Sequence, residues 1–197
     1  MRVLIGCEFS GTVRDRFIAM GHDAISCDLL PTEAAGPHIV GDVVDVLYGS
    51  EWDLAIIHPP CTYLASSGLH WNNKIEGRAE KTEEALTFIA TLWNAPVKHM
   101  CIENPVGCIN TRLEFMPKPQ YIQPYNYGED ASKKTGLWMR GLAPLQETEY
   151  VEPRTVNGKN RWGNQSNSGQ SMLGGGSGHE RSVTYFGIAA AMAEQWG

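Results

Sequence analysis

The sequence lacks the features that mark membrane and secreted proteins. It contains no run of about 18 consecutive apolar residues, so it predicts no membrane-spanning helix. Its opening residues, MRVLIGCEFS, carry one arginine and then turn polar, unlike a secretory signal peptide. We therefore expect a cytoplasmic protein without a membrane partner.

Cysteine is sparse and shows no pairing pattern. The five cysteines form an odd set without a C-x-x-C motif, which argues against a disulfide framework and against a structural zinc site. His58 with Cys61, or His99 with Cys101, could be regarded as metal ligands, but we expect no metal site. Most of these thiols lie in apolar runs, which is typical of inert core residues.

An excess of positive charge is also absent. The formal net charge is −6, which argues against a surface coated with nucleic-acid-binding charge. The distribution is uneven, because residues 153–179 include Arg154, Lys159 and Arg161 and no acidic residue. Such a basic, polar segment can meet phosphate groups. A surface loop explains the same composition, so both interpretations stay open.

Short apolar runs alternate with helical patterns, which is typical of a parallel sheet with crossover helices. The length of 197 residues fits one domain with a real core. We predict a single α/β domain over 1–197 with a doubly wound, Rossmann-like, mostly parallel sheet and a flexible basic excursion at about 153–180. The predicted strands are 2–6, 23–28, 37–43, 52–58, 97–104, 120–125 and 135–141, and the predicted helices are 11–21, 80–93 and 187–196.

Polar and reactive residues follow the predicted strands. In a doubly wound sheet, ligands bind outside the carboxyl ends of the strands, so we expect these residues to converge on one edge. In chain order they are Glu8 and Ser10 after the first strand, Asp28 after the second, Asp42 after the third, Pro59, Pro60 and Cys61 after the fourth, and Glu103 and Asn104 at the end of the fifth.

Two acids at this edge suit a ligand that contains adenosine. Asp28 can accept hydrogen bonds from both ribose hydroxyls, or it can serve as a turn or cap residue. Asp42 can accept from an adenine amino group, or it can cap the segment that follows. The turn GCEFSG, residues 6–11, opens a helix between two glycines but does not match G-x-G-x-x-G.

Cys61 and Glu103 are the residues with the clearest chemical character. A thiolate is a strong nucleophile, and two prolines before Cys61 fix the turn that presents it. A buried small hydrophobe is the alternative role for this cysteine. Glu103 ends a buried strand, where burial is expected to raise its pKa. Facing a cysteine, it suits nucleophilic addition to an electron-poor ring; a capping or salt-bridged glutamate is the alternative.

Together these motifs resemble the cytosine-5 DNA methyltransferase family. The turn at 59–61 is similar to its Pro-Cys nucleophile motif, and residues 103–105 are similar to its Glu-Asn-Val motif, with proline in place of valine. The Gly-rich loop, ribose acid, adenine acid, late basic motif SKKTGLWMRG and closing helix SVTYFGIAAAMAEQW follow in the same chain order. As a whole, the chain is similar to compact methyltransferase-like proteins of phage genomes.

The resemblance implies S-adenosylmethionine or a close derivative as methyl donor and DNA as partner. It implies no obligate protein partner. If the chain is phage-encoded, the expected location is the host cytoplasm. The implied catalytic residues are Cys61, Glu103, Pro60 and Asn104. The implied donor-binding residues are Gly6, Cys7, Glu8, Phe9, Ser10, Gly11, Asp28, Leu29, Asp42, Val43 and Pro59. The candidate phosphate contacts are Lys133, Lys134, Arg154, Lys159 and Arg161.

The chain also departs from the family. A large target-recognition domain is usual near the C-terminal end, and here only about 140–182 is available, so we expect a short or relaxed target. An amino-methyltransferase is disfavoured, because its Asp/Asn-Pro-Pro-aromatic turn is replaced by residues 58–61, His-Pro-Pro-Cys. An RNA or nucleotide acceptor, a modified donor, and a non-catalytic nucleic-acid-binding protein remain as alternatives.

Overall fold

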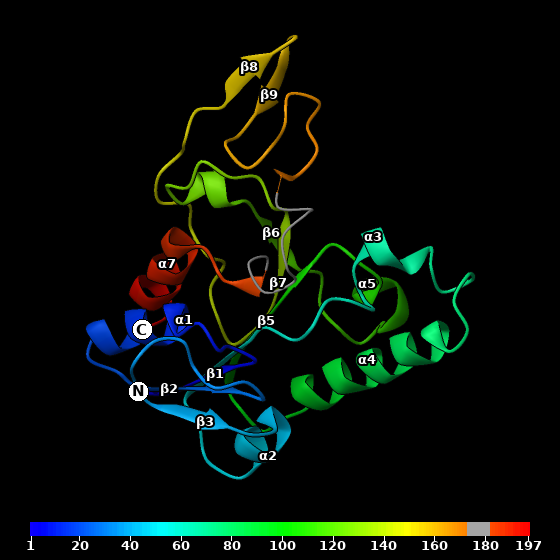
Figure 1. Ribbon diagram of the computed structural model, residues 1–197. Coiled ribbons are helices and arrows are strands. Elements are labelled where there is room, and N and C mark those ends of the chain that lie inside the picture. Colours follow the sequence, from blue (N-terminus) through cyan, green and yellow to red (C-terminus); the bar gives the residue numbers. More distant parts are fainter. Residues whose placement is uncertain (173–181) are drawn as a thin grey trace.

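A seven-stranded sheet forms the centre of the computed structural model, which describes residues 1–172 and 182–197 (Figure 1). The strand order is β3-β2-β1-β4-β5-β7-β6. The first five strands are parallel, β7 is antiparallel to β5, and β6 is antiparallel to β7. The predicted α/β, doubly wound and mostly parallel sheet is therefore confirmed.

The predicted strands and long helices all occur, with small shifts at their ends. The strands of the sheet are β1 (Arg2–Gly6), β2 (Asp23–Asp28), β3 (His38–Val40), β4 (Leu54–Ile57), β5 (His99–Pro105), β6 (Gln120–Ile122) and β7 (Thr135–Arg140). The helices are α1 (Thr12–Ala19), α2 (Val43–Tyr48), α3 (Ser66–Leu69), α4 (Arg78–Trp93), α5 (Ile109–Arg112) and α7 (Phe186–Trp196), with a 3₁₀ turn η1 (Pro124–Asn126).

Helices cover both faces of the sheet (Figure 1). Successive residues of a strand point to opposite faces, so a strand covered on both faces is apolar throughout. In β4, Leu54 and Ile56 belong to the core beneath α1 and α7, whereas Ala55 and Ile57 belong to the core beneath α2 and α4. Among the described residues no helix is long and apolar enough to span a membrane.

The basic segment after residue 153 is more ordered than its composition indicates. It contains a hairpin of β8 (Arg154–Val156) and β9 (Lys159–Arg161), which extends away from the sheet in Figure 1. Asn157 and Gly158 both have positive φ, 50° and 71°, as a two-residue hairpin turn requires. Trp162 anchors the hairpin, because its ring stacks on Tyr125 with centroids 4.0 Å apart. Residues 173–180 of the predicted excursion lie outside the described residues.

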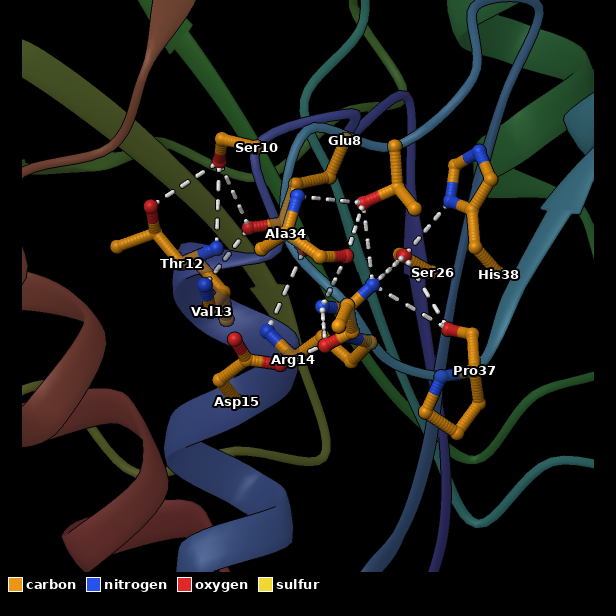
Figure 2. Close-up of polar contacts among 12 residues, drawn as sticks. Glu8, Ser10, Thr12, Val13, Arg14, Asp15, Ser26, Ala34, Pro37 and His38 are labelled. Carbon is orange, nitrogen blue, oxygen red and sulfur yellow. Dashed lines mark hydrogen bonds and ion pairs between the residues drawn. The ribbon is translucent and has the colours of Figure 1, made fainter.

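A buried arginine fastens the segment between β2 and β3 to the first helix (Figure 2). The side chain of Arg14 is fully buried and donates to the backbone carbonyls of Ala34 and Ala35, each at 3.2 Å. It also donates to the hydroxyl of Ser26 at 3.1 Å and pairs with Asp15 at 2.8 Å. These contacts hold the chain that follows Asp28 and Leu29 in one position.

Replacing Arg14 with methionine should destabilise the protein by about 3 kcal/mol, because the buried Ser26 hydroxyl and the part-buried carbonyl groups of Ala34 and Ala35 lose their charged donor. Urea denaturation of wild-type and variant protein measures this loss of unfolding free energy. Arg112→Met is the matched control, since Arg112 is exposed and its ion pair with Glu83 is also exposed, so a loss below about 1 kcal/mol is expected. Equal losses in the two variants would contradict the proposed fastening role.

Candidate functional site

The carboxyl ends of β1, β4 and β5 lie side by side at one edge of the sheet. In the parallel register, Ile57 of β4 pairs with Gly6 of β1 on one side and with Ile102 of β5 on the other. The residues that follow these three positions are therefore neighbours in space. Most of the residues predicted to converge line two cavities at this edge, and Pro60 lines both of them. Glu8 and Ser10 line neither of these two cavities.

The first cavity, here called the catalytic cavity, has a volume of about 430 Å³. All four predicted catalytic residues line it, and Cys61 is exposed to solvent instead of sealed in the core. Its lining residues are His58, Pro59, Pro60, Cys61, Thr62, Ala65, Ser67, Gly68, Glu103, Asn104, Pro105, Lys133 and Ser182.

A buried amide positions the turn that carries Cys61. Nδ2 of Asn104 donates to the carbonyl of Pro59 over 2.8 Å, which links the end of β5 to the turn after β4. The carbonyl of Cys61 accepts from the backbone N–H groups of Leu64 and Ala65, at 3.0 and 2.9 Å. The backbone around Cys61 is thus fixed by these bonds, and the exposed cysteine lines the cavity.

Glu103 forms a hydrogen bond with His58, whose Nδ1 lies 3.1 Å from Oε2 of the carboxylate. Burial alone raises the pKa of Glu103, but hydrogen bonding and charge from His58, with further support from Lys133 and the Thr135 hydroxyl, hold that pKa below its ordinary value. The expectation that burial would leave this pKa raised is therefore wrong. The charged neighbours outweigh the loss of water.

Two buried polar atoms beside the cavity lack partners within the described part of the chain. They are Nε2 of His58 and Oδ1 of Asn104. Each residue uses its other polar atom for a short contact, to Glu103 and to the carbonyl of Pro59 respectively. Burying a polar group without a hydrogen-bond partner reduces the free energy of unfolding, and such groups are often found at sites that bind a ligand.

The second cavity, here called the donor cavity, has a volume of about 350 Å³. It lies between the ends of β1, β2 and β3 and one side of α4, and it contains several of the predicted donor-binding residues. Its lining residues are Cys7, Asp28, Leu29, Gly41, Asp42, Val43, Pro60, Tyr63, Lys81, Glu84, Ala85 and Phe88.

Asp28 and Asp42 line this cavity and also have structural roles. Oδ1 of Asp28 accepts from the N–H of Leu30 at 2.9 Å, and Oδ1 of Asp42 accepts from the N–H of Val44 at 2.8 Å as the cap of α2. Both acids therefore have the turn or cap role considered for them, and both also form part of the cavity wall. In each acid, Oδ1 fixes the local backbone. Among the described contacts, Oδ2 makes no hydrogen bond and can bind a ligand.

The remaining predicted donor residues lie outside the donor cavity. Glu8 accepts from the N–H groups of Val13 and Arg14 at 2.7 and 3.3 Å, so its carboxylate caps α1 (Figure 2). The buried Phe9, Ser10 with its hydroxyl near Glu8, and Gly11 with φ of 76° complete the same helix entry, while Pro59 lines the catalytic cavity.

Gly6 has a steric role behind the donor cavity. A Cβ atom at this position would lie 2.5 Å from Cγ2 of Val43 and 2.6 Å from Cδ1 of Ile57. A larger residue at this position would displace the packed side chains of Val43 and Ile57, which glycine avoids. Direct donor contact by Gly6 and by the residues of the helix entry stays a prediction.

The predicted phosphate contacts are separated in space. Lys133 lines the catalytic cavity, whereas Nζ of Lys134 lies 4.5 Å from the ring centroid of Tyr121. In the hairpin, Arg154 donates to the carbonyl of Gln165, and Arg161 donates to three nearby carbonyls. Lys159 is exposed on β9. Only Lys133 is thus brought to the catalytic cavity, and the guanidinium groups brace the loop after β9.

Sequence reasoning did not find every lining residue. Tyr63 and the α4 residues Lys81, Glu84 and Phe88 line the donor cavity, but the sequence analysis did not single them out. His58 was considered only as a metal ligand, and within the described residues no cluster of three metal-ligating side chains exists. The signal for His58 was its position at the end of β4, next to the turn that carries Cys61.

Replacing Asn104 with alanine should lower the free energy of unfolding by about 1–3 kcal/mol, because the buried Pro59 carbonyl loses its donor. Urea denaturation measures this change. Asn160→Ala, on the exposed side of β9, is the control and should lie within about 0.5 kcal/mol of wild type. An Asn104 variant as stable as the control would show that the amide does not hold the turn.

No family model and no curated protein matches the chain. Among solved structures it is similar to a candidate DNA modification methyltransferase encoded within an Escherichia coli prophage, with 13% identity and a TM-score of 0.47, over 79% of this chain and 53% of that chain. The Entamoeba histolytica methyltransferase EhMeth matches with 14% identity and a TM-score of 0.46, over 79% of this chain and 60% of that chain. An Escherichia coli rRNA methylase matches with 13% identity and a TM-score of 0.40, over 71% of this chain and 57% of that chain. The chain spans little more than half the length of these structures.

Proposed function

We propose that the protein is an S-adenosylmethionine-dependent methyltransferase that modifies carbon 5 of cytosine in DNA. The observation that carries this proposal is the shared cavity of an exposed cysteine and a paired glutamate, which adjoins the donor cavity at Pro60. A nucleophile, an acid and a methyl donor can then meet around a single ring. The order of motifs along the chain supports the same function.

The donor cavity suits S-adenosylmethionine. Carboxylates at the ends of β2 and β3 can accept hydrogen bonds from ribose hydroxyls and an adenine amino group, and Phe88 and Val43 offer apolar surface to the base. The acids Asp28, Asp42 and Glu84 also make the cavity favourable for a cationic sulfonium. When bound, this donor supplies an electrophilic methyl group.

Cys61 performs the step that makes carbon 5 reactive. Its thiolate adds to carbon 6 of cytosine and forms an S–C bond. Glu103, which is ionised at rest, takes up a proton from solvent and gives it to ring nitrogen 3 as negative charge develops on the ring. Carbon 5 then accepts the methyl group, its proton is lost to a base, and the S–C bond breaks to release Cys61 as ring nitrogen 3 returns its proton to Glu103. The cysteine is regenerated, and the product is 5-methylcytosine.

The acceptor must reach a cavity at the edge of the sheet. A base in a duplex has to leave the stack at a cost of about a few kcal/mol, whereas a single-stranded base is already accessible. Lys133 at the cavity wall and Lys159 on the exposed hairpin are placed to meet phosphates. The small size of the hairpin supports a short or relaxed target.

Replacing Cys61 with alanine should reduce methyl transfer at least about 10³-fold, because the covalent route is removed. Transfer of tritiated methyl groups from S-adenosylmethionine to mixed-sequence DNA measures the loss, and calorimetry should show unchanged donor affinity. Cys108→Ala is the control, since that buried thiol lies outside both cavities. Turnover by the Cys61 variant at the control's rate would dismiss covalent catalysis.

Replacing Asp28 with asparagine should weaken donor binding by about 10- to 100-fold, because a charged hydrogen-bond acceptor for the ribose becomes neutral. Calorimetric titration with S-adenosylmethionine measures this affinity. Asp23→Asn provides the matched control at the opposite end of the same strand, β2, and should bind the donor like wild type. If both variants bind equally well, the adenosine pocket lies elsewhere.

The proposed reaction is tested by the nucleosides that the protein produces. DNA and RNA from cells that express wild-type protein or the Cys61→Ala variant are digested, and the nucleosides are identified by mass. We expect 5-methylcytosine in DNA from the wild-type cells above the level in the variant cells. A methyl group only in RNA, or on the amino group of a base, would contradict the proposed acceptor.

A further inference from the structure

An exposed tryptophan lies next to the catalytic cavity. Ser67 and Gly68 of α3 line that cavity, and the backbone N–H of Trp71, three residues further along, donates to the carbonyl of Gly68 at 3.2 Å. Trp71 is 44% exposed. Figure 1 shows the segment between α3 and α4 at an outer edge of the molecule. A large aromatic ring is therefore open to solvent beside the cavity in which the proposed reaction takes place.

The segment that carries Trp71 is fastened to α4. Nδ2 of Asn72 donates to the hydroxyl of Thr82 at 2.9 Å, and that hydroxyl donates to the carbonyl of Tyr63 at 3.0 Å. Thr82 is buried, so these bonds are shielded from water. Because they hold the chain on both sides of Trp71, the ring is presented from a fixed backbone. A ligand that binds there orders little of the protein.

Cations lie beside both the ring and the cavity. Nζ of Lys74 lies 5.2 Å from the ring centroid of Trp71, within the range of a cation–π contact, and Lys133 lines the catalytic cavity. The exposed Glu76 forms no ion pair with Lys74 among the described residues. An aromatic surface accompanied by cations is typical of proteins that bind single-stranded nucleic acid, because the rings stack on bases and the cations meet phosphates.

Resting on the function proposed above, we propose that Trp71 is a stacking platform for the base next to the target cytosine, and that the acceptor is a single-stranded DNA segment. The cytosine occupies the catalytic cavity, the neighbouring base lies on the Trp71 ring, and Lys74 and Lys133 meet phosphates. In a duplex the neighbouring base stays paired with the opposite strand and cannot turn onto this ring, whereas a single-stranded base can. Every base has a face that stacks, so the contact fits a short or relaxed target.

The contact is tested by removing each of its partners in turn. Single-stranded oligonucleotides carry one cytosine, and an abasic sugar replaces the base on one side of it or on the other. Fluorescence anisotropy at a fixed salt concentration measures their affinity for wild-type protein and for Trp71→Ala. We expect the variant to bind the intact oligonucleotide about 10-fold more weakly, and the abasic sugar at one of the two positions to weaken wild-type binding by about the same factor. The two losses should not add, because each change removes the same contact.

Trp71→Phe and Tyr48→Ala are the controls. Phenylalanine keeps an aromatic ring, so its affinity should stay within about threefold of wild type. Tyr48 is similarly exposed, at 46%, but lies on α2 outside both cavities, so its variant should bind like wild type. Losses that add at both positions in Trp71→Ala would overturn the inference. A coupling found only with duplex DNA would overturn it as well.

A measurement on wild-type protein covers the case in which Trp71→Ala does not fold. A single-stranded oligonucleotide with 5-iodouracil beside the cytosine is irradiated in complex with the protein, which links the base to an aromatic ring stacked on it. Peptide mass spectrometry locates the link. A link to Trp71 supports the inference, whereas links only to other residues, or none, overturn it.

These outcomes separate the platform from the proposed reaction. Wild-type protein that methylates DNA but shows no coupling at Trp71 would contradict the platform alone. Coupling at Trp71 without methyl transfer would support the platform and contradict the proposed reaction. Protein that neither binds nor methylates DNA would contradict both.

Discussion

The parallel pairing of β4 with β5 is the constraint on which the site depends. Because Ile57 is in register with Ile102, the residues that follow the two strands leave the sheet side by side. The amide of Asn104 then fixes this arrangement through its 2.8 Å bond to the carbonyl of Pro59. A slip of one residue would turn Glu103 to the other face and remove it from Cys61.

Electrostatics gives the two cavities different characters. The donor cavity is bordered by acids that also fix their own loops, so its polar groups are held in place before a ligand binds. The catalytic cavity instead contains the hydrogen-bonded side chains of His58 and Glu103, together with Lys133 and the exposed Cys61. A cationic donor and an electron-poor ring are the ligands that these two environments suit, and Pro60 lies between them.

The sequence allowed prediction of the sheet, the long helices and the edge where the site lies, because apolar runs and strand ends follow simple periodic rules. It did not reveal that Glu8 caps α1, since a capping carboxylate and a ligand-binding one look alike in a sequence. The turn at Asn157 and Gly158 carried a hairpin signal that the loop-like composition obscured. The lowered pKa of Glu103 depends on a partner 45 positions away, which only the fold brings near.

In the proposed reaction, Cys61 forms a covalent bond with a pyrimidine while the methyl donor is bound next to it. Oligonucleotides that contain 5-fluorocytosine trap such an enzyme, because the fluorine at carbon 5 cannot be removed as a proton is. After incubation with S-adenosylmethionine, peptide mass spectrometry locates the attachment. We expect a methylated nucleotide adduct on the peptide that contains Cys61. An adduct on another residue, or no adduct with single-stranded or duplex substrate, would contradict it.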